Sequence, residues 1–211
     1  MKPMIYGFAQ SSYVWTVRAA AACKGVDVDF RQIEPGHHKS DEYLALHPFG
    51  KVPALVHGDV KLYESLAICI YLDAAFGGRP LRPTDPARLA QMHQWISAIN
   101  AYLYRPAVVE YLFGYIFPGT EDGAPDRVQI ERAMPSLRNF VKVLDENLDG
   151  THLMGHALTI ADLFLAPLIF VLYRGPEGQE LINDHVNVLR YMKTMQDNEE
   201  FMSVAPRSPD A

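Results

Sequence analysis

The sequence predicts an α/β domain followed by an all-α helical-bundle domain. Strand and helix patterns alternate up to Pro80, and strand patterns largely disappear beyond it. A proline-punctuated stretch separates the two blocks. At 211 residues the chain is long enough for two small domains, each burying its own core. The expected boundaries are a first domain at 1–79, a linker at 80–86 and a helical domain at 87–211.

The first block is expected to run strand, helix, strand, helix, two strands and helix. Gly25 is placed to end the first helix, and strict apolar–polar alternation from Val26 to Ile33 is typical of a half-buried strand. A short turn at 58–59 predicts a hairpin. A βαβ half joined to a ββα half makes a compact sheet domain. The expected strands are 2–8, 26–33, 52–57 and 60–63, and the expected helices are 11–24, 40–46 and 64–76.

The second block shows helical patterns throughout. The stretch from Thr159 to Tyr173 is almost entirely apolar, which indicates a central, buried helix. A kink or break is expected at Pro106, because proline removes a backbone hydrogen bond from a helix interior. The tail from Ala205 is expected to be loose. The expected helices are 86–104, 106–115, 126–148, 159–173 and 185–196.

The composition argues against several functional classes. The chain is 49% hydrophobic and 21% charged, as in ordinary soluble domains, and its net charge of −6 disfavours a general nucleic-acid binder. The longest apolar run, 163–173, is too short for a membrane helix, which needs about 20 residues. Cys23 and Cys69 lack the spacing of a metal clip or redox pair, and no signal peptide is apparent. The reducing cytoplasm is therefore the expected compartment.

Pro53 enters a strand pattern within the run HPFGKVPAL. Proline cannot donate a hydrogen bond to a sheet ladder. If the Val52–Pro53 bond is cis, the backbone turns sharply and frees the N–H and C=O groups of Val52, which can then pair with an extended peptide ligand. The alternative is an ordinary trans proline in an edge strand, since only about 5–6% of such bonds are cis.

Hydroxyl side chains stand at two expected helix starts. Ser65 follows Glu64 where strand changes to helix, and a helix N-terminus binds carboxylates through its unpaired N–H groups. Glu64 can accept a hydrogen bond from an ammonium group. At the first helix, Ser11 or Ser12 can hydrogen-bond a thiolate and lower the pKa of the thiol, in the same sense as the positive helix end. The alternative at both starts is ordinary helix capping.

These motifs, in this order, resemble the cytosolic glutathione S-transferases. The run HPFGKVPAL followed by YESLAI is similar to the family's cis-proline loop and its Glu/Gln-Ser site. The resemblance covers nearly the whole chain, is nearest to serine-type phi- or theta-like members of plants and bacteria, and implies a thioredoxin-like first domain. The run TIAD is similar to the family's N-capping box. With Thr159 at the N-cap and Asp162 at N3, it is expected to support folding and bind nothing.

The resemblance implies a glutathione site in the first domain. The backbone of Val52, beside a cis Pro53, would pair with the cysteinyl part of the tripeptide. Glu64 and Ser65 would hold the γ-glutamyl ammonium and carboxylate groups. Basic side chains would meet the glycyl carboxylate, and these are His38, Lys39 and Lys51. The alternative is that they belong to a solvated loop.

The residue that activates the thiol is expected to be a serine. The family's pattern of Ser or Cys, then Pro, then an aromatic residue puts Ser11 at the active position, with Ser12 in place of the proline and Tyr13 as the aromatic. Ser12 is the alternative. Both cysteines fall on expected helices, which argues against a member with a nucleophilic cysteine at this position.

Glutathione is the implied co-substrate, and the implied reaction conjugates its thiolate to a small hydrophobic electrophile. The alternatives are a lyase, isomerase or peroxidase on the same fold and a non-catalytic interaction protein. No metal is expected, because His152 and His156 flank a loop with no apparent third ligand. The family resemblance also implies a homodimer. The electrophile pocket is expected between the domains. The alternative is that its aromatic residues belong to the core. The expected pocket residues are Phe8, Ala9, Tyr13, Tyr102 and Tyr104.

Overall fold

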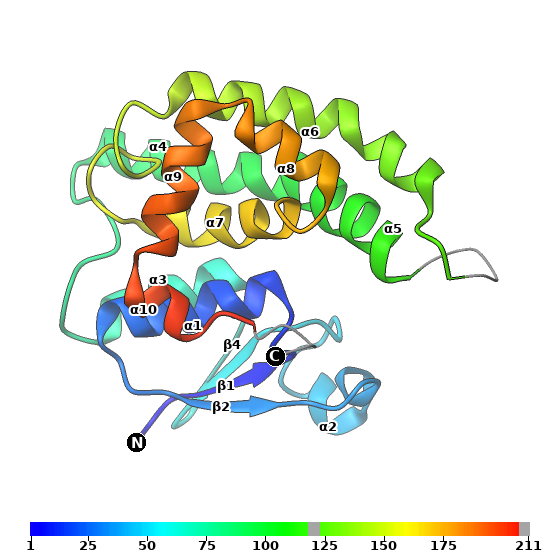
Figure 1. Cartoon of the computed structure of the whole chain (residues 1–211). Coiled ribbons are helices and arrows are strands. Elements are labelled where there is room, and N and C mark those ends of the chain that lie inside the picture. Colours follow the sequence, from blue (N-terminus) through cyan, green and yellow to red (C-terminus); the bar gives the residue numbers. More distant parts are fainter. Residues whose placement is uncertain (118–122, 207–211) are drawn as a thin grey trace. The chain divides into compact units, whose positions relative to one another are not determined.

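The computed structural model describes residues 1–117 and 123–206 and divides into two compact units (Figure 1). Unit 1 consists of Met1–Arg82 together with Asn198–Ala211, and unit 2 is Pro83–Asp197. The first boundary falls within the linker expected at 80–86. The described residues from Asn198 onward group with the sheet-containing unit, whereas the sequence predicts a single helical domain over 87–211.

Unit 1 contains a four-stranded sheet in the order β2-β1-β3-β4. β1 is parallel to β2 and antiparallel to β3, and β3 and β4 form the expected hairpin. This topology is the predicted βαβ half joined to a ββα half. The strands are β1 Met4–Gly7, β2 Asp29–Gln32, β3 Ala54–His57 and β4 Val60–Tyr63. β2 is shorter than the strand expected at 26–33, because it lies at the sheet edge and pairs only with the four residues of β1.

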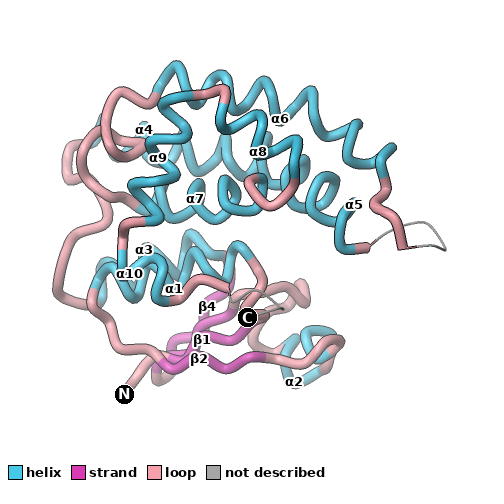
Figure 2. The backbone as a smooth tube through the Cα atoms, in the orientation of Figure 1, coloured by secondary structure: helices cyan, strands magenta, loops and turns pink. Residues whose placement is uncertain are grey.

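Helices α1 and α3 cover one face of the sheet, and α2 lies beyond the ends of β1 and β2 (Figure 1 and Figure 2). Gly25 ends α1 with a left-handed φ of 71°, as expected. α10 packs on α1, where the indole N–H of Trp15 donates to the carbonyl of Phe201 at 3.1 Å and the two rings stack. The sequence patterns do not reveal this short helix. The helices of unit 1 are α1 Ser12–Lys24, η1 His37–Lys39, α2 Asp41–Leu44, α3 Ser65–Ala75 and α10 Glu199–Ser203.

A buried ion pair joins the C-terminal ends of α1 and α3. The Nζ of Lys24 lies 3.0 Å from Oδ1 of Asp73, and the two side chains are 4% and 6% exposed. Asp73 also accepts hydrogen bonds from Nε of Arg82 at 2.6 Å and from the N–H of Leu81 at 2.8 Å. Burial by itself raises the pKa of Asp73, but these hydrogen bonds outweigh burial and hold the pKa below its ordinary value.

The described part of unit 2 is mainly helical, with α7 at its centre. All residues of α7 except Phe170 are buried, which confirms the predicted central helix. The helices described in unit 2 are α4 Pro86–Ala98, η2 Ile99–Leu103, η3 Arg105–Leu112, α5 Phe113–Ile116, α6 Arg127–Asn147, α7 Ile160–Leu172, α8 Pro176–Asn183 and α9 Val186–Gln196.

Of the kink or break expected at Pro106, the break does not occur. The chain stays helical from α4 to α5, and η2 and η3 have π-helical geometry. Wider π turns accommodate a residue that has no N–H to donate, so the helix continues through the proline. The sequence patterns also miss α8, although Pro176 at its first position is a common helix-start signal.

Candidate functional site

The sheet topology brings three predicted motifs to one end of the sheet. β3 runs antiparallel to both β1 and β4, so the start of β3 lies beside the ends of the other two strands. The register shows this directly, since Ala54 pairs with Tyr6 and with Tyr63. The motif residues that adjoin these strand ends are Ser11 after β1, Val52 before β3 and Glu64 after β4. Residues far apart in the sequence therefore converge.

The loop before β3 has the expected geometry. The Val52–Pro53 bond is cis, so the alternative of an ordinary trans proline is wrong. Among the described residues, neither the N–H nor the C=O of Val52 has a hydrogen-bond partner. These groups can pair with an extended ligand as an added strand would.

Contacts on both sides hold this loop. The N–H of Gly50 donates to the carbonyl of His47 at 2.9 Å. Gly50 has a φ of 56°, and a Cβ there would lie 2.9 Å from the carbonyl oxygen of His38, so glycine permits this close approach. From the other side, Oη of Tyr43 donates to the carbonyl of Lys51 at 2.9 Å.

Sequence reasoning assigned no role to two buried residues near this loop, Tyr43 and His47. The His47 ring lies 5.0 Å from the ring of Tyr63, and within the described residues its Nδ1 has no partner. Burial lowers the pKa of His47, so the imidazole is neutral at pH 7. His47 opens the run HPFGKVPAL and Tyr43 lies outside every motif, and in both cases the packed position of the side chain is what indicates a role.

The basic segment in η1 lies next to the loop and to the residue that follows β1. The ring of His38 meets the ring of Phe8 edge-on, with centroids 5.5 Å apart, and its Nδ1 is buried without a partner among the described residues. Lys39 and Lys51 are exposed, and neither forms an ion pair in the part of the chain that the structure describes. This segment can present positive charge to an anion.

The start of α3 is open. Glu64 has a φ of 67°, the one positive value among the described non-glycine residues, and its side chain makes no capping hydrogen bond to them. Ser65 is 6% exposed, and no described residue hydrogen-bonds its hydroxyl. Ordinary capping by these side chains, the alternative at this position, is therefore wrong. Backbone conformations of this kind concentrate at functional sites.

The start of α1 is capped. The hydroxyl oxygen of Ser11 accepts a hydrogen bond from the N–H of Val14 at 3.4 Å. A hydroxyl has two acceptor lone pairs and one proton, so this bond leaves the proton free to donate to a ligand. Ser11 is half-buried, whereas Ser12 is 8% exposed. Capping and ligand activation are thus compatible at Ser11.

The residues expected to line the electrophile pocket come from both units. Phe8, Ala9 and Tyr13 are half-buried in unit 1, and Tyr104 is half-buried in unit 2, where burial raises its pKa. Tyr102 instead lines a groove of about 630 Å³ within unit 2, formed by α4, η2, η3 and α6. Residues two positions apart on a helix point to different sides, so Tyr102 and Tyr104 do not share a face.

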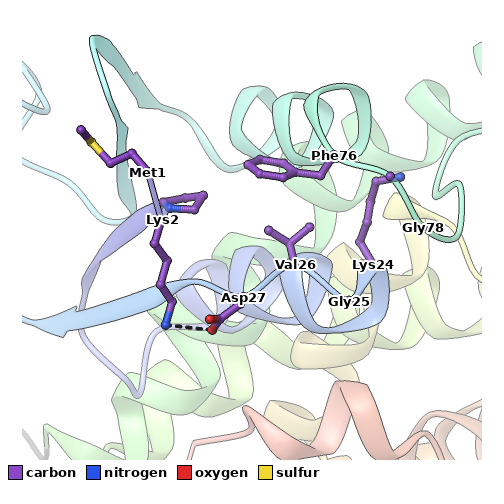
Figure 3. A pocket seen from close by; sticks show the side chains of 10 residues that line it. Met1, Lys2, Lys24, Gly25, Val26, Asp27, Phe76 and Gly78 are labelled. Atoms are coloured by element: carbon purple, nitrogen blue, oxygen red, sulfur yellow. Dashed lines mark ion pairs between the residues drawn. The ribbon is translucent and has the colours of Figure 1, made fainter.

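A second cavity, of about 500 Å³, lies at the opposite end of β1 (Figure 3). Its lining includes Met1, Lys2, Asp27 and Phe76, and Lys2 forms an ion pair with Asp27 at 2.8 Å. None of the predicted site residues lines it.

The described residues contain no group of three His, Cys, Asp or Glu side chains that could hold a metal ion, and no described helix is long and apolar enough to cross a membrane. Cys69 is fully buried, and burial raises the pKa of Cys23 to about 12. Neither thiol therefore has the character of a nucleophile.

Comparisons with known proteins agree with this picture. The model of the glutathione S-transferase N-terminal domain matches residues 5–80, and that of the C-terminal domain matches residues 104–199. Glutathione S-transferase 1 of Dianthus caryophyllus is 32% identical, over 82% of this chain and 79% of its own length. Glutathione S-transferase F13 of Arabidopsis thaliana is 30% identical, over 81% of this chain and 78% of its own.

Among solved structures, poplar glutathione transferase F1 matches with a TM-score of 0.86 at 26% identity, covering 97% of this chain and 96% of that one. These relatives confirm the predicted fold, a thioredoxin-like domain followed by a helical one, and an enzyme with glutathione as co-substrate. They do not favour the lyase, isomerase, peroxidase or non-catalytic alternatives. The chain belongs to the glutathione S-transferase family.

Proposed function

We propose that unit 1 binds glutathione at the end of the sheet where β1 and β4 terminate, and that the bound thiolate is conjugated to a small hydrophobic electrophile. The observation that carries this proposal is that unpaired polar groups converge at that end of the sheet. The backbone of Val52 and the hydroxyl of Ser65 lack partners among the described residues, and both adjoin the same end of the sheet. Buried or half-buried polar groups without a protein partner are expected to meet a ligand.

Each part of the tripeptide has a complementary group. The N–H and C=O of Val52 pair with the cysteinyl residue in the manner of an added strand. The first N–H groups of α3 and the Ser65 hydroxyl bind the γ-glutamyl carboxylate, and Glu64 accepts from the ammonium. Basic side chains meet the glycyl carboxylate, and these are His38, Lys39 and Lys51.

Ser11 acts on the sulfur. Its hydroxyl proton, which the bond from Val14 leaves free, donates to the glutathione sulfur and stabilises the thiolate. The positive end of α1 acts in the same direction, so the thiol loses its proton to solvent near neutral pH. The sulfur then forms a bond to the electrophilic carbon, and the leaving group departs with its bonding electron pair.

Within unit 1, the half-buried side chains of Phe8, Ala9 and Tyr13, on the residues after β1, contact the electrophile. Tyr102 belongs to the separate groove in unit 2. We further propose a homodimer in the cytoplasm that binds no nucleic acid and no membrane. The family and the net charge of −6 support this assignment, and light scattering after gel filtration tests the dimer.

Ser11→Ala tests the assignment of the activating residue. We expect kcat with a chloronitrobenzene electrophile to fall about 100-fold, because the glutathione thiolate loses one hydrogen-bond donor. The pKa of bound glutathione, followed by thiolate absorbance, should rise, while glutathione binding stays nearly intact.

Ser12→Ala is the matched control, and it should change kcat less than twofold. If Ser12→Ala abolished activity while Ser11→Ala left rate and thiol pKa unchanged, Ser12 would be the activating residue.

A further inference from the structure

Tyr43 occupies a central place behind the proposed glutathione site. It lies in α2, is 1% exposed and packs in one cluster with Ile33 and Ala54, against which Val52 and Phe8 also pack. Its ring therefore fills space between the sheet and the loop that precedes β3. A phenylalanine would fill this space equally well, so the hydroxyl needs a separate explanation.

The hydroxyl has one clear partner. Oη donates to the carbonyl of Lys51 at 2.9 Å, across a separation of eight residues. Burial raises the pKa of Tyr43 to about 12, so the phenol keeps its proton at neutral pH and remains a donor. A buried hydroxyl without a partner costs about 1–3 kcal/mol, which makes this bond the expected arrangement.

The carbonyl that Tyr43 holds belongs to the same peptide unit as the N–H of Val52. A peptide unit is planar, so fixing the direction of the Lys51 C=O also fixes the direction of the Val52 N–H. That N–H has no partner among the described residues and lies at the site proposed for the cysteinyl backbone. The phenol thus controls the orientation of a ligand-binding group that it does not touch.

We propose that Tyr43 is a positioning residue that orients the Val52 N–H toward the cysteinyl carbonyl of glutathione. The inference rests on the proposed function and adds a determinant of glutathione affinity outside the binding motifs. Tyr43 does not contact the sulfur or Ser11 in this scheme. Its loss should weaken glutathione binding and leave the chemistry of the bound thiol alone.

Tyr43→Phe removes only the hydroxyl and keeps the buried ring. We expect the Kd for glutathione, measured by calorimetry, and the KM for glutathione to rise about threefold to tenfold, as loss of one neutral hydrogen bond predicts. At saturating glutathione, kcat should stay within about twofold of the wild-type value. The pKa of the bound thiol should stay within a few tenths of a unit of the wild-type value. A merely structural role would lower the melting temperature without this split between KM and kcat.

Tyr191→Phe is a matched control. Tyr191 is also fully buried, and its hydroxyl also donates to a backbone carbonyl, that of Asp162 at 3.2 Å, but it lies in unit 2. It should lose a similar amount of thermal stability with no change in Kd. An equal rise in Kd for both variants, or no rise for Tyr43→Phe, would overturn the proposal.

A truncated ligand tests whether Tyr43 acts on the cysteinyl backbone site or through the basic segment. γ-Glutamylcysteine lacks the glycyl carboxylate but keeps the cysteinyl backbone, so Tyr43→Phe should weaken its binding by the same factor. A loss confined to full glutathione would mean that Tyr43 acts through the basic segment, and the proposal would be wrong. If the wild-type protein bound neither ligand, the proposed glutathione site itself would fail.

The wild-type protein offers a readout that does not depend on how the variant folds. The amide resonance of Val52 in a valine-labelled sample should shift when glutathione is added, because its N–H gains a partner. A Val52 amide that does not move at saturating glutathione would overturn the proposal.

Discussion

The starts of α3 and α7 pair similar side chains and use them in opposite ways. Each combines a hydroxyl with a carboxylate, Ser65 with Glu64 and Thr159 with Asp162. At α7, Asp162 is fully buried and accepts hydrogen bonds from the N–H of Thr159 at 2.8 Å and from the N–H of Leu153 at 2.7 Å. At α3, neither side chain hydrogen-bonds a described residue.

The difference separates groups that stabilise the fold from groups that stay open for the proposed ligand. The capping box at α7 is confirmed, and its polar atoms are satisfied inside the protein. The start of α3 carries the backbone conformation of a functional site, a positive φ at Glu64, and leaves its polar atoms open. Hydrogen-bond satisfaction, more than residue type, distinguishes the two.

The largest effect is expected at Asp162. Asp162→Ala leaves the N–H groups of Leu153 and Thr159 unpaired in a buried place, so we expect a loss of about 3 kcal/mol in the free energy of unfolding. Urea denaturation measures this loss. The Kd for glutathione of the remaining folded protein should not change, and a weakened Kd at unchanged stability would reverse the comparison.

Ser65→Ala should show the opposite pattern. Because the hydroxyl has no partner among the described residues, its removal should change the free energy of unfolding by less than about 0.5 kcal/mol. The Kd for glutathione should rise about tenfold, because a hydrogen bond to a charged carboxylate is lost. Calorimetry and urea denaturation on the same sample test both halves. A strongly destabilised variant with normal affinity would show that Ser65 is structural.

The smallest effect is expected in the pH dependence of stability that comes from Asp73, whose buried carboxylate is satisfied by Lys24, Leu81 and Arg82. Its pKa is lower in the folded than in the unfolded protein, so its stabilisation is present above the unfolded value of about 3.9 and is lost as pH falls toward the folded value. Asp73→Asn should therefore destabilise the protein at pH 7, and the difference in the free energy of unfolding between the two proteins should shrink below about pH 4.

Urea denaturation of wild type and Asp73→Asn at several pH values measures this difference. A gap that stayed constant down to pH 3 would contradict the assigned pKa direction.

Local signals in the sequence were sufficient for much of the fold and for part of the site. Gly25 as a helix stop and the Thr159–Asp162 box depend on contacts within a few residues, so the pattern alone predicts them. The cis bond before Pro53 followed from motif resemblance, whereas bare patterns favoured a trans bond there and a cap at the start of α3.

Other features depend on which surfaces pack together. The hydroxyl of Tyr43 meets the carbonyl of Lys51 because α2 packs against the sheet, and no periodicity links these two positions. α10 joins unit 1 through Trp15 and Phe201, which are nearly the length of the chain apart.

The sequence by itself determined the order of elements, the two-block organisation and the residue types available at each helix start, because hydrophobic periodicity and capping act locally. Only the tertiary structure decided which of those polar groups are satisfied and which stay open. That outcome depends on hydrogen-bond partners that other segments supply, as for Asp162 and Lys51, or fail to supply, as for Val52 and Ser65 among the described residues.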